Sequence, residues 1–433
     1  MKLRNLLGLV GTAGMLATTP LAAQQAASAC VDRATIRRTT PLTATGQPIY
    51  VERADPRAIT GGIALIGEPT YIWAARDTFV DREHPGRSSF LVDSSRDLNR
   101  VPIGVRIAPN GIATPILRPK GVVRMLTPRT TSLSAGRVLV VWGSDAESAP
   151  DTSTVVRRVW SAIYDGATWT RPALVFAGDP ISWNQQSMAI VADDSDVVHL
   201  AVPSIDRVKG WVGIVHATFD GTGWHTEELA PEVLPPTRVA MVGGKSRPMR
   251  IFYAGLVNAD GAFTPAIISW SRATAGQAWQ RDIVVRPLAP NTGGAITAAL
   301  VGDVAHLYWT SDHQQPVQRI EHWRLATAGA WQKVDSIVVG ASQLIAMPTE
   351  RGVVFVAQDS RTGSVMMLSS TNAGWAVPVV LNSEQVGGTV TAGLHNGREL
   401  IVTWGVIRDP GANGLGWPIA PQLQVVRLAL RCD

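Results

Sequence analysis

Short apolar segments with the same internal order recur along the chain. VVWGSD at 140–145 and LYWTSD at 307–312 each join an apolar run to a small, polar end. Each related segment follows a cluster of Gly, Asp, Asn, Ser or Pro, residues that tight turns favour. Each copy is therefore predicted to be the second strand of a β-hairpin. Their central residues, 47 to 69 positions apart, are Trp73, Trp142, Val202, Tyr253, Trp309, Val356 and Trp404.

A second motif places Gly one to three positions before Trp. A short apolar run follows each copy. Gly allows the positive φ angle of a tight turn, and the Trp is expected to anchor the strand that follows. The motif is interpreted as the turn between a third and a fourth strand. Its copies are DGATW (165–169), DGTGW (220–224), TAGQAW (274–279), TAGAW (327–331), TNAGW (371–375) and the degenerate NGIATP (110–115).

Four short strands repeated at a period near 50 residues are typical of a β-propeller. Apolar positions at the 3.6-residue spacing of helical repeats are missing. The sequence therefore predicts an all-β fold, a single β-propeller of seven four-stranded blades over residues 24–433. A count of six or eight blades follows if the irregular first unit is divided differently.

The first 23 residues have the pattern of a secretory signal peptide. Lys2 and Arg4 precede an apolar run from Leu6 to Leu21 and the small-residue segment LAAQ. No later stretch reaches the roughly 18–20 apolar residues of a transmembrane helix. The protein is therefore expected to be secreted or periplasmic, with acylation of Cys30 as a lipoprotein left as an alternative.

The ends of the chain are predicted to close the ring. The seventh unit lacks a Gly-Trp turn, and the strand-like N-terminal segment 31–41 can supply its outer strand. The two cysteines, Cys30 and Cys432, would then meet where other blades have that turn. A disulfide between them is compatible with export to an oxidising compartment.

The turns YDGATW and FDGTGW resemble degenerate Asp-box turns of the sialidase-like propellers, also called BNR-repeat proteins. The resemblance implies a propeller fold. In that family the Asp box is structural and lies opposite the active site. The nearest match to the sialidase Arg-Ile-Pro segment is VRIAP (105–109), which has an inserted Ala and precedes an outer-strand turn. The sialidase catalytic residues are therefore not transferred to this chain.

Ligands of propellers usually bind the face formed by the loops between second and third strands and between blades. The long insertion 77–100 and the segment 408–421 belong to these loops. The alternative roles are turn formation for the Asp side chains and packing between blades for the Trp side chains. The ligand-binding candidates are Arg76, Asp77, Asp81, Glu83, His84, Arg87, Asp145, Trp183, Asp312, His313, Arg361, Arg408 and Trp417.

The sequence favours recognition of a glycan or an extracellular protein, with no identifiable catalytic residues. The alternatives are a carbohydrate-active enzyme, either a glycoside hydrolase or a polysaccharide lyase, and an envelope scaffold. No cofactor is expected, and no metal, because His residues lack ligand spacing. His199 and His306 occupy the same place in DVVHLAV and DVAHLYW and are interpreted as strand features. Removing Lys2 and Arg4 leaves 37 basic and 34 acidic residues, a net charge of +3, so nucleic-acid binding is not indicated. The protein is expected to be a monomer.

Overall fold

The computed structural model describes most residues between 35 and 431. The longer gaps are 47–60, 76–101, 145–157, 181–187, 233–237, 286–293, 311–316 and 407–421. The predicted signal peptide (1–23) and both cysteines lie outside the described residues. For residues 61–67 and 70–75 the backbone is described and the side chains are not.

The described strands form seven antiparallel sheets, which are called the first to seventh blades in chain order. The first blade contains β2 (Gly61–Gly67), β3 (Thr70–Ala75), β4 (Pro102–Ile107) and β5 (Ala113–Leu117). The second contains β6 (Leu126–Ser132), β7 (Val138–Ser144), β8 (Arg158–Tyr164) and β9 (Ala173–Ala177). The third contains β10 (Asp179–Pro180), β11 (Ala189–Ala192), β12 (Val198–Asp206), β13 (Trp211–Phe219) and β14 (Trp224–Glu228).

The fourth blade contains β15 (Val239–Gly244), β16 (Arg247–Ala259), β17 (Ala262–Arg272) and β18 (Gln280–Val285). The fifth contains β19 (Ile296–Val301), β20 (Val304–Thr310), β21 (Ile320–Leu325) and β22 (Trp331–Ile337). The sixth contains β23 (Gln343–Thr349), β24 (Gly352–Gln358), β25 (Val365–Thr371), β26 (Gly374–Trp375) and β27 (Val379–Asn382). The seventh contains β28 (Thr391–His395), β29 (Glu399–Val406), β30 (Gln422–Ala429) and the N-terminal β1 (Arg37–Thr39).

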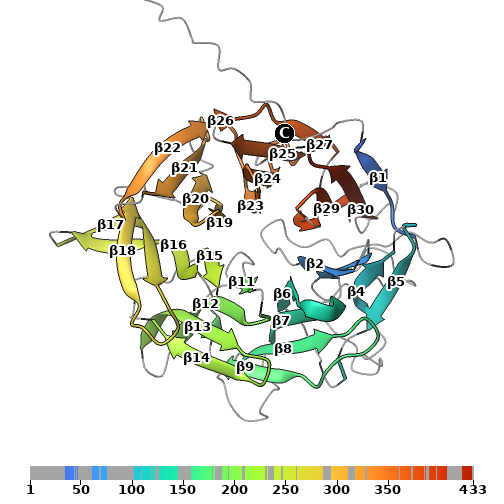
Figure 1. Ribbon diagram of the computed structural model, residues 1–433, viewed down its shortest axis with the longest axis horizontal. Coiled ribbons are helices and arrows are strands. Elements are labelled where there is room, and N and C mark those ends of the chain that lie inside the picture. The colour runs from blue at the N-terminus through green and yellow to red at the C-terminus, as the bar shows by residue number, and fades with distance from the viewer. Residues whose placement is uncertain are drawn as a thin grey trace, which may run out of the picture.

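The blades stand around a common axis, each with its first strand innermost (Figure 1). Neighbouring inner strands contact each other in sequence around the ring, and β2 of the first blade contacts β28 of the seventh. The molecule is therefore a closed propeller.

Five of the seven sheets have the predicted four strands, whereas the third and sixth blades depart from the prediction and contain five. In the third blade, β10 and β11 pair with different parts of β12. In the sixth, β26 and β27 pair with different parts of β25. Pro378 lies between β26 and β27, and proline has no N–H to donate to the ladder. An interrupted edge strand in each case gives the fifth element.

The segments of the first motif are second strands, as predicted. The six of their central residues whose side chains are described are at most 5% exposed. Apolar residues cover both faces of these strands, and Val138 to Trp142 of β7 are all buried. A strand between two neighbouring blades buries both faces, which explains the continuous apolar runs. The apolar clusters accordingly span adjacent blades, with β7 and β8 packing on β12, for example.

The Gly-Trp turns join third and fourth strands, as predicted. The Gly of all six copies has a positive φ, between 82° and 103°. This backbone conformation strains residues that carry a Cβ. In the two turns with an Asp, that carboxylate accepts two backbone N–H groups of its own turn, from Ala167 and Thr168 to Asp165 and from Thr222 and Gly223 to Asp220.

The Trp of each turn contacts the preceding blade as well as its own strand. Trp224 Nε1 donates to Ser161 Oγ of the second blade at 2.8 Å. Trp375 Nε1 donates to Asp335 Oδ1 of the fifth blade at 2.9 Å. The predicted role as a strand anchor is thus incomplete, because these indoles also connect neighbouring blades.

The N-terminal strand closes the seventh blade. β1 pairs with β30 through Arg37, Arg38 and Thr39. Side chains add to this pairing: the Thr35 hydroxyl accepts the Ala429 N–H at 3.1 Å, and Gln424 Nε2 donates to Thr40 Oγ1 at 2.8 Å. The described strand is shorter than the predicted segment 31–41. The predicted disulfide lies outside the described residues and stays a prediction.

Candidate functional site

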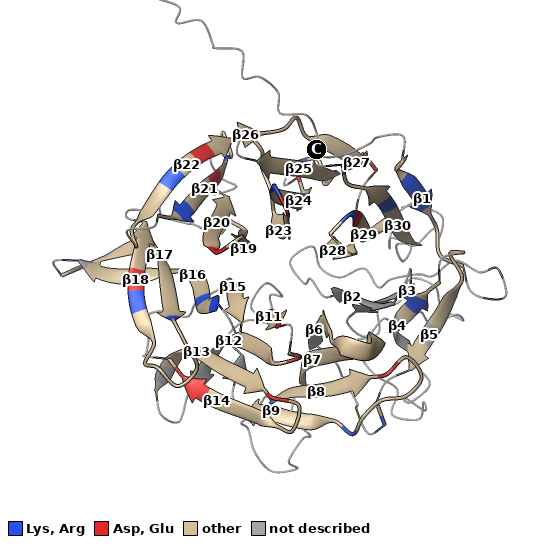
Figure 2. Ribbon diagram, in the orientation of Figure 1, with Lys and Arg blue, Asp and Glu red and all other residues tan. Residues whose placement is uncertain are grey.

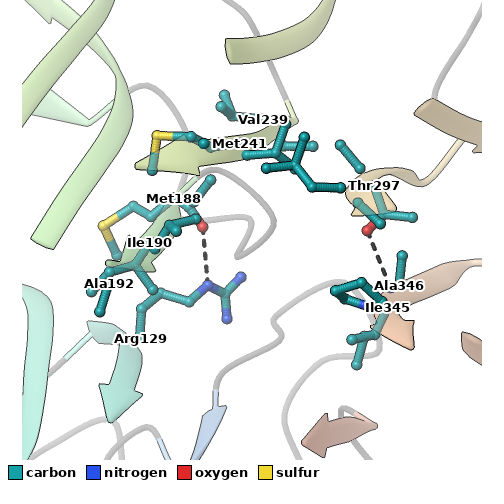
Figure 3. Close-up of a pocket in the computed structure, with 18 of the residues that line it drawn as sticks. Arg129, Met188, Ile190, Ala192, Val239, Met241, Thr297, Ile345 and Ala346 are labelled. Atoms are coloured by element: carbon teal, nitrogen blue, oxygen red, sulfur yellow. Dashed lines mark hydrogen bonds between the residues drawn. The ribbon is translucent and has the colours of Figure 1, made fainter. Parts of the chain in front are cut away.

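A central channel of about 930 Å³ runs between the inner strands of six blades. Its lining comes from β6, β11, β15, β19, β23 and the beginning of β28. Each inner strand pairs on one side only, so its other edge faces the axis. Such an edge presents backbone N–H and C=O groups that no neighbouring strand uses. Between these polar edges the lining is apolar and includes Met188, Ile190 and Met241 (Figure 3).

Arg129 of β6 supplies a positive charge to this channel. Its Nε donates to the backbone oxygen of Met188 at 3.2 Å, which directs the end of the guanidinium into the cavity (Figure 3). Burial lowers the pKa of Arg129 to about 10. This value is far above 7, so the group remains a cation at neutral pH.

Thr130, next to Arg129, also lines the channel. It is 9% exposed, and its hydroxyl has no hydrogen-bond partner within the described part of the chain. Leaving a buried hydroxyl without a partner costs about 1–3 kcal/mol. A polar ligand or water in the channel would remove that cost.

Other polar groups of the lining connect blades to each other. Thr297 Oγ1 accepts the Ala346 N–H at 3.2 Å, and Gln343 Oε1 accepts the Val390 N–H at 3.0 Å. These bonds hold neighbouring inner strands in place. Of the charged side chains of the lining, Arg247 forms an ion pair with Asp303, and Asp193 accepts backbone N–H groups of its own turn. Arg129, through the end of its guanidinium, and Thr130 are therefore the side chains best suited to bind a guest in the channel.

Only one of the predicted ligand-binding residues lies in the described part of the chain. Arg361 is exposed in the turn after β24, and its backbone N–H donates to Asp359 Oδ1 at 2.8 Å. Whether it lies near the other candidates is not described, and the predicted grouping stays a prediction. The twelve outside the described residues are Arg76, Asp77, Asp81, Glu83, His84, Arg87, Asp145, Trp183, Asp312, His313, Arg408 and Trp417.

Asp359 follows the second strand of the sixth blade, so it shows whether an Asp at this position forms a turn, the alternative to ligand binding. Its Oδ1 accepts the N–H groups of Arg361 and Thr362, at 2.8 and 2.7 Å. At this position the carboxylate therefore stabilises the turn, which is the common role of Asp after a strand.

Two buried histidine chains, one in the third blade and one in the fifth, form a repeated polar feature. His216 Nδ1 lies 2.7 Å from Glu227 Oε1, and His199 Nδ1 lies 3.3 Å from His216 Nε2. An ionised carboxylate only accepts, so His216 donates to Glu227 and accepts from His199. Burial opposes ionisation of Glu227, but the hydrogen bond from His216 and the charge of Arg272 lower its pKa to about 2.

The fifth blade repeats this arrangement. His306 Nδ1 is 2.8 Å from His322 Nε2, and His322 Nδ1 is 3.0 Å from Asp335 Oδ1. Each carboxylate also accepts a hydrogen bond from the following blade, Glu227 from Arg272 at 2.7 Å and Asp335 from Trp375 at 2.9 Å. These two histidine chains thus join second, third and fourth strands to a neighbouring blade. They agree with the interpretation of His199 and His306 as strand features.

Sequence reasoning missed Arg129, His216 and His322. Arg129 stands in LTPRTTS, a segment without the alternation that marks a half-buried strand. His216 and His322 lie 17 and 16 residues after their His partners. In a blade whose consecutive strands are neighbours, a His on the strand after His199 or His306 can lie beside it. This spacing is the sequence feature that could have identified His216 and His322. Among the described residues, no three His, Cys, Asp or Glu side chains are grouped to hold a metal ion, and no helix could cross a membrane.

No protein-family model and no curated protein sequence matches this chain. Among solved structures, an ulvan lyase, titled as a new family of polysaccharide lyase, is similar with a TM-score of 0.51 and 10% identity. The match covers 91% of this chain and 96% of the lyase. At that identity it shows the fold alone.

Two other similar structures have lower TM-scores. A Dyadobacter fermentans protein of unknown function has 14% identity over 71% of this chain and 95% of its own, with a TM-score of 0.46. The Aleuria aurantia lectin, titled a six-bladed β-propeller with a novel fucose recognition mode, has 15% identity over 64% of this chain and 86% of its own, with a TM-score of 0.41.

Proposed function

We propose that this protein is an exported, monomeric, non-catalytic β-propeller that binds a glycan at its central channel. The channel itself carries the proposal. It combines unpaired strand edges, which can exchange hydrogen bonds with sugar hydroxyls, with apolar side chains and the guanidinium of Arg129. The second arginine of the lining, Arg247, forms an ion pair with Asp303 at 3.4 Å. A volume of about 930 Å³ is suited to an oligosaccharide, because ligand pockets usually enclose about 300–1,000 Å³.

Arg129 is assigned as the anchor of the ligand. A guanidinium binds carboxylate or sulfate oxygens through two parallel N–H bonds and can also bond hydroxyl oxygens. The ligand class is therefore an oligosaccharide, with preference for one that carries an acidic group. The predicted loop residues, including Trp183 between β10 and β11, would add contacts at the rim.

Two observations support this class of ligand. The Asp-box-like turns resemble those of sialidase-like propellers, in which carbohydrate is the substrate. The ulvan lyase shares the fold and is a polysaccharide lyase by its title, although that likeness extends to the fold alone. Polysaccharides are therefore the appropriate ligands to test first.

The test is a glycan array, followed by titration calorimetry with the best ligand. Loss of a charge-assisted hydrogen bond costs about 1.5–3 kcal/mol, so Arg129→Gln is expected to weaken binding roughly 10- to 100-fold. Arg171→Gln is the matched control, because Arg171 is exposed in the turn after Trp169 and far from the lining. Equal affinity of both variants would place the site elsewhere.

A product assay on the same polysaccharides separates binding from catalysis. Reducing ends and unsaturated products are measured in parallel with the array. Retention without turnover is expected. Turnover that requires Asp81, Glu83 or His84 would replace the binding function with the lyase or hydrolase alternative, and the absence of both binding and turnover would favour a scaffold.

A further inference from the structure

A second cavity of about 760 Å³ lies where the first and seventh blades meet. Its walls are β1, β30, the β28–β29 turn and residues 107–111 of the first blade. We call this cavity the seam pocket and define it by Arg37, Thr39, Arg398, Glu399 and Arg427. It is separate from the central channel, because the two cavities have no lining residue in common.

Arginine side chains from three segments line the seam pocket. Arg37 of β1 stands directly opposite Arg427 of β30 in the antiparallel register, and Arg398 comes from the β28–β29 turn. Figure 2 shows the basic positions of β1 and β30 side by side. Directly opposed residues of antiparallel strands project from the same face, and like charges there destabilise the pair. An anion bound at Arg37 would reduce this repulsion.

The acidic residues of the pocket leave two of these cations without ion pairs. Glu350 and Glu399 also line it, yet within the described part of the chain neither forms a salt bridge with Arg37 or Arg398. Arg37 and Arg398 are exposed, so their guanidinium groups are accessible to a solute. The pocket holds three arginines against two carboxylates, and it therefore favours an anionic guest.

We propose that the seam pocket binds a small molecule through an oxyanion group. The guanidinium fork matches phosphate, sulfate and carboxylate oxygens, and two or more such forks hold one anion from different sides. The volume of the pocket leaves room for the rest of the molecule beside its anionic group. The ligand joins β1 to the β28–β29 turn, so it stabilises the closure of the ring.

The proposal is tested with inorganic phosphate and with glucuronate, in titration calorimetry and thermal unfolding at constant ionic strength. A ligand that binds only the folded state raises the melting temperature. Phosphate is expected to raise it above the value in sodium chloride. If glucuronate raises the melting temperature and phosphate does not, the natural ligand carries a carboxylate. If phosphate raises it and glucuronate does not, the natural ligand is a phosphate or sulfate ester.

The double variant Arg37→Gln/Arg398→Gln is expected to weaken phosphate binding by roughly tenfold or more. Both residues are exposed, so the variant keeps its fold, and circular dichroism checks this. Arg171→Gln removes the same kind of charge from another blade and should bind phosphate like the parent. Glu350→Gln should tighten binding, because it removes a negative charge from the pocket.

Two results would overturn the proposal. One is equal phosphate affinity in the double variant and in Arg171→Gln. The other is the absence of binding by both anions at millimolar concentration. The assay contains no oligosaccharide, so its outcome is independent of whether the central channel binds a glycan.

Discussion

The contacts between neighbouring blades include hydrogen bonds from single tryptophan nitrogens. Trp224 begins the fourth strand of the third blade, and its Nε1 reaches back to Ser161 in the second. Ser161 is 2% exposed, so its hydroxyl has little access to water. Removing a hydrogen bond to a buried group lowers stability mainly because the remaining buried donor or acceptor has no partner. This one bond is therefore expected to affect stability measurably.

Replacing Trp224 with Phe tests that expectation. The aromatic ring remains beside Phe219, whereas the N–H donor to Ser161 is lost. We expect the free energy of unfolding in urea to fall by about 1–3 kcal/mol, the cost of an unsatisfied buried hydroxyl.

A double-mutant cycle with Ser161→Ala isolates the bond from the change in ring size. In the Ser161→Ala background the same Trp224 substitution should cost less, because no hydroxyl is left unsatisfied. Identical costs in both backgrounds would mean that the bond contributes nothing.

At the scale of elements, the sequence was sufficient for the strands that bury both faces. Apolar runs such as VLVVW and the Gly of each Gly-Trp turn depend only on local geometry, so both could be predicted. The interruption of the edge strand at Pro378 is also local. Whether it divides that strand in two depends on its pairing with β25, which the local sequence does not specify. Arg129 was missed because a channel-lining role arises only when the ring closes.

The loop candidates have a different status. Segments such as 77–100 lack the repeating pattern that predicted the strands, and they lie outside the described residues. Arg361 alone could be compared with the structure, and it is exposed in a turn. The sequence patterns located the strands of the blades, whereas the binding residues stay predictions.

The N-terminal strand provides a prediction at this same scale. A chain that begins at residue 44 lacks β1, so it exposes the edge of β30 and loses the bond from Arg38 to the Leu381 oxygen. Exposed strand edges pair with other chains. We expect a lower melting temperature and self-association, measured by calorimetry and by light scattering after size exclusion.

A chain that begins at Thr35 is the matched control. It keeps β1 and lacks Cys30, so it separates the contribution of the strand from that of the predicted disulfide. If both shortened chains melt and elute alike, β1 has no part in closing the ring.

For the whole molecule, the two histidine chains couple blade packing to pH. Each lies at a different interface, one against Trp279 of the fourth blade and one against Trp375 of the sixth. Burial, then the adjacent His216, lowers the pKa of His199 to about 4, and burial, then His322, lowers that of His306 to about 4. Both values are below the ordinary 6.5.

The direction of the pH effect on stability follows from these lowered pKa values. The folded state binds these protons less readily than the unfolded chain, so stability is complete above pH 6.5 and falls as pH decreases through 4. For buried His199 the loss by pH 4 is on the order of 2–3 kcal/mol. Urea unfolding from pH 7 to pH 4 should show this decline, and the double variant His199→Gln/His306→Gln should show a smaller one. An equal decline in the parent and the double variant would assign the acid sensitivity to other groups.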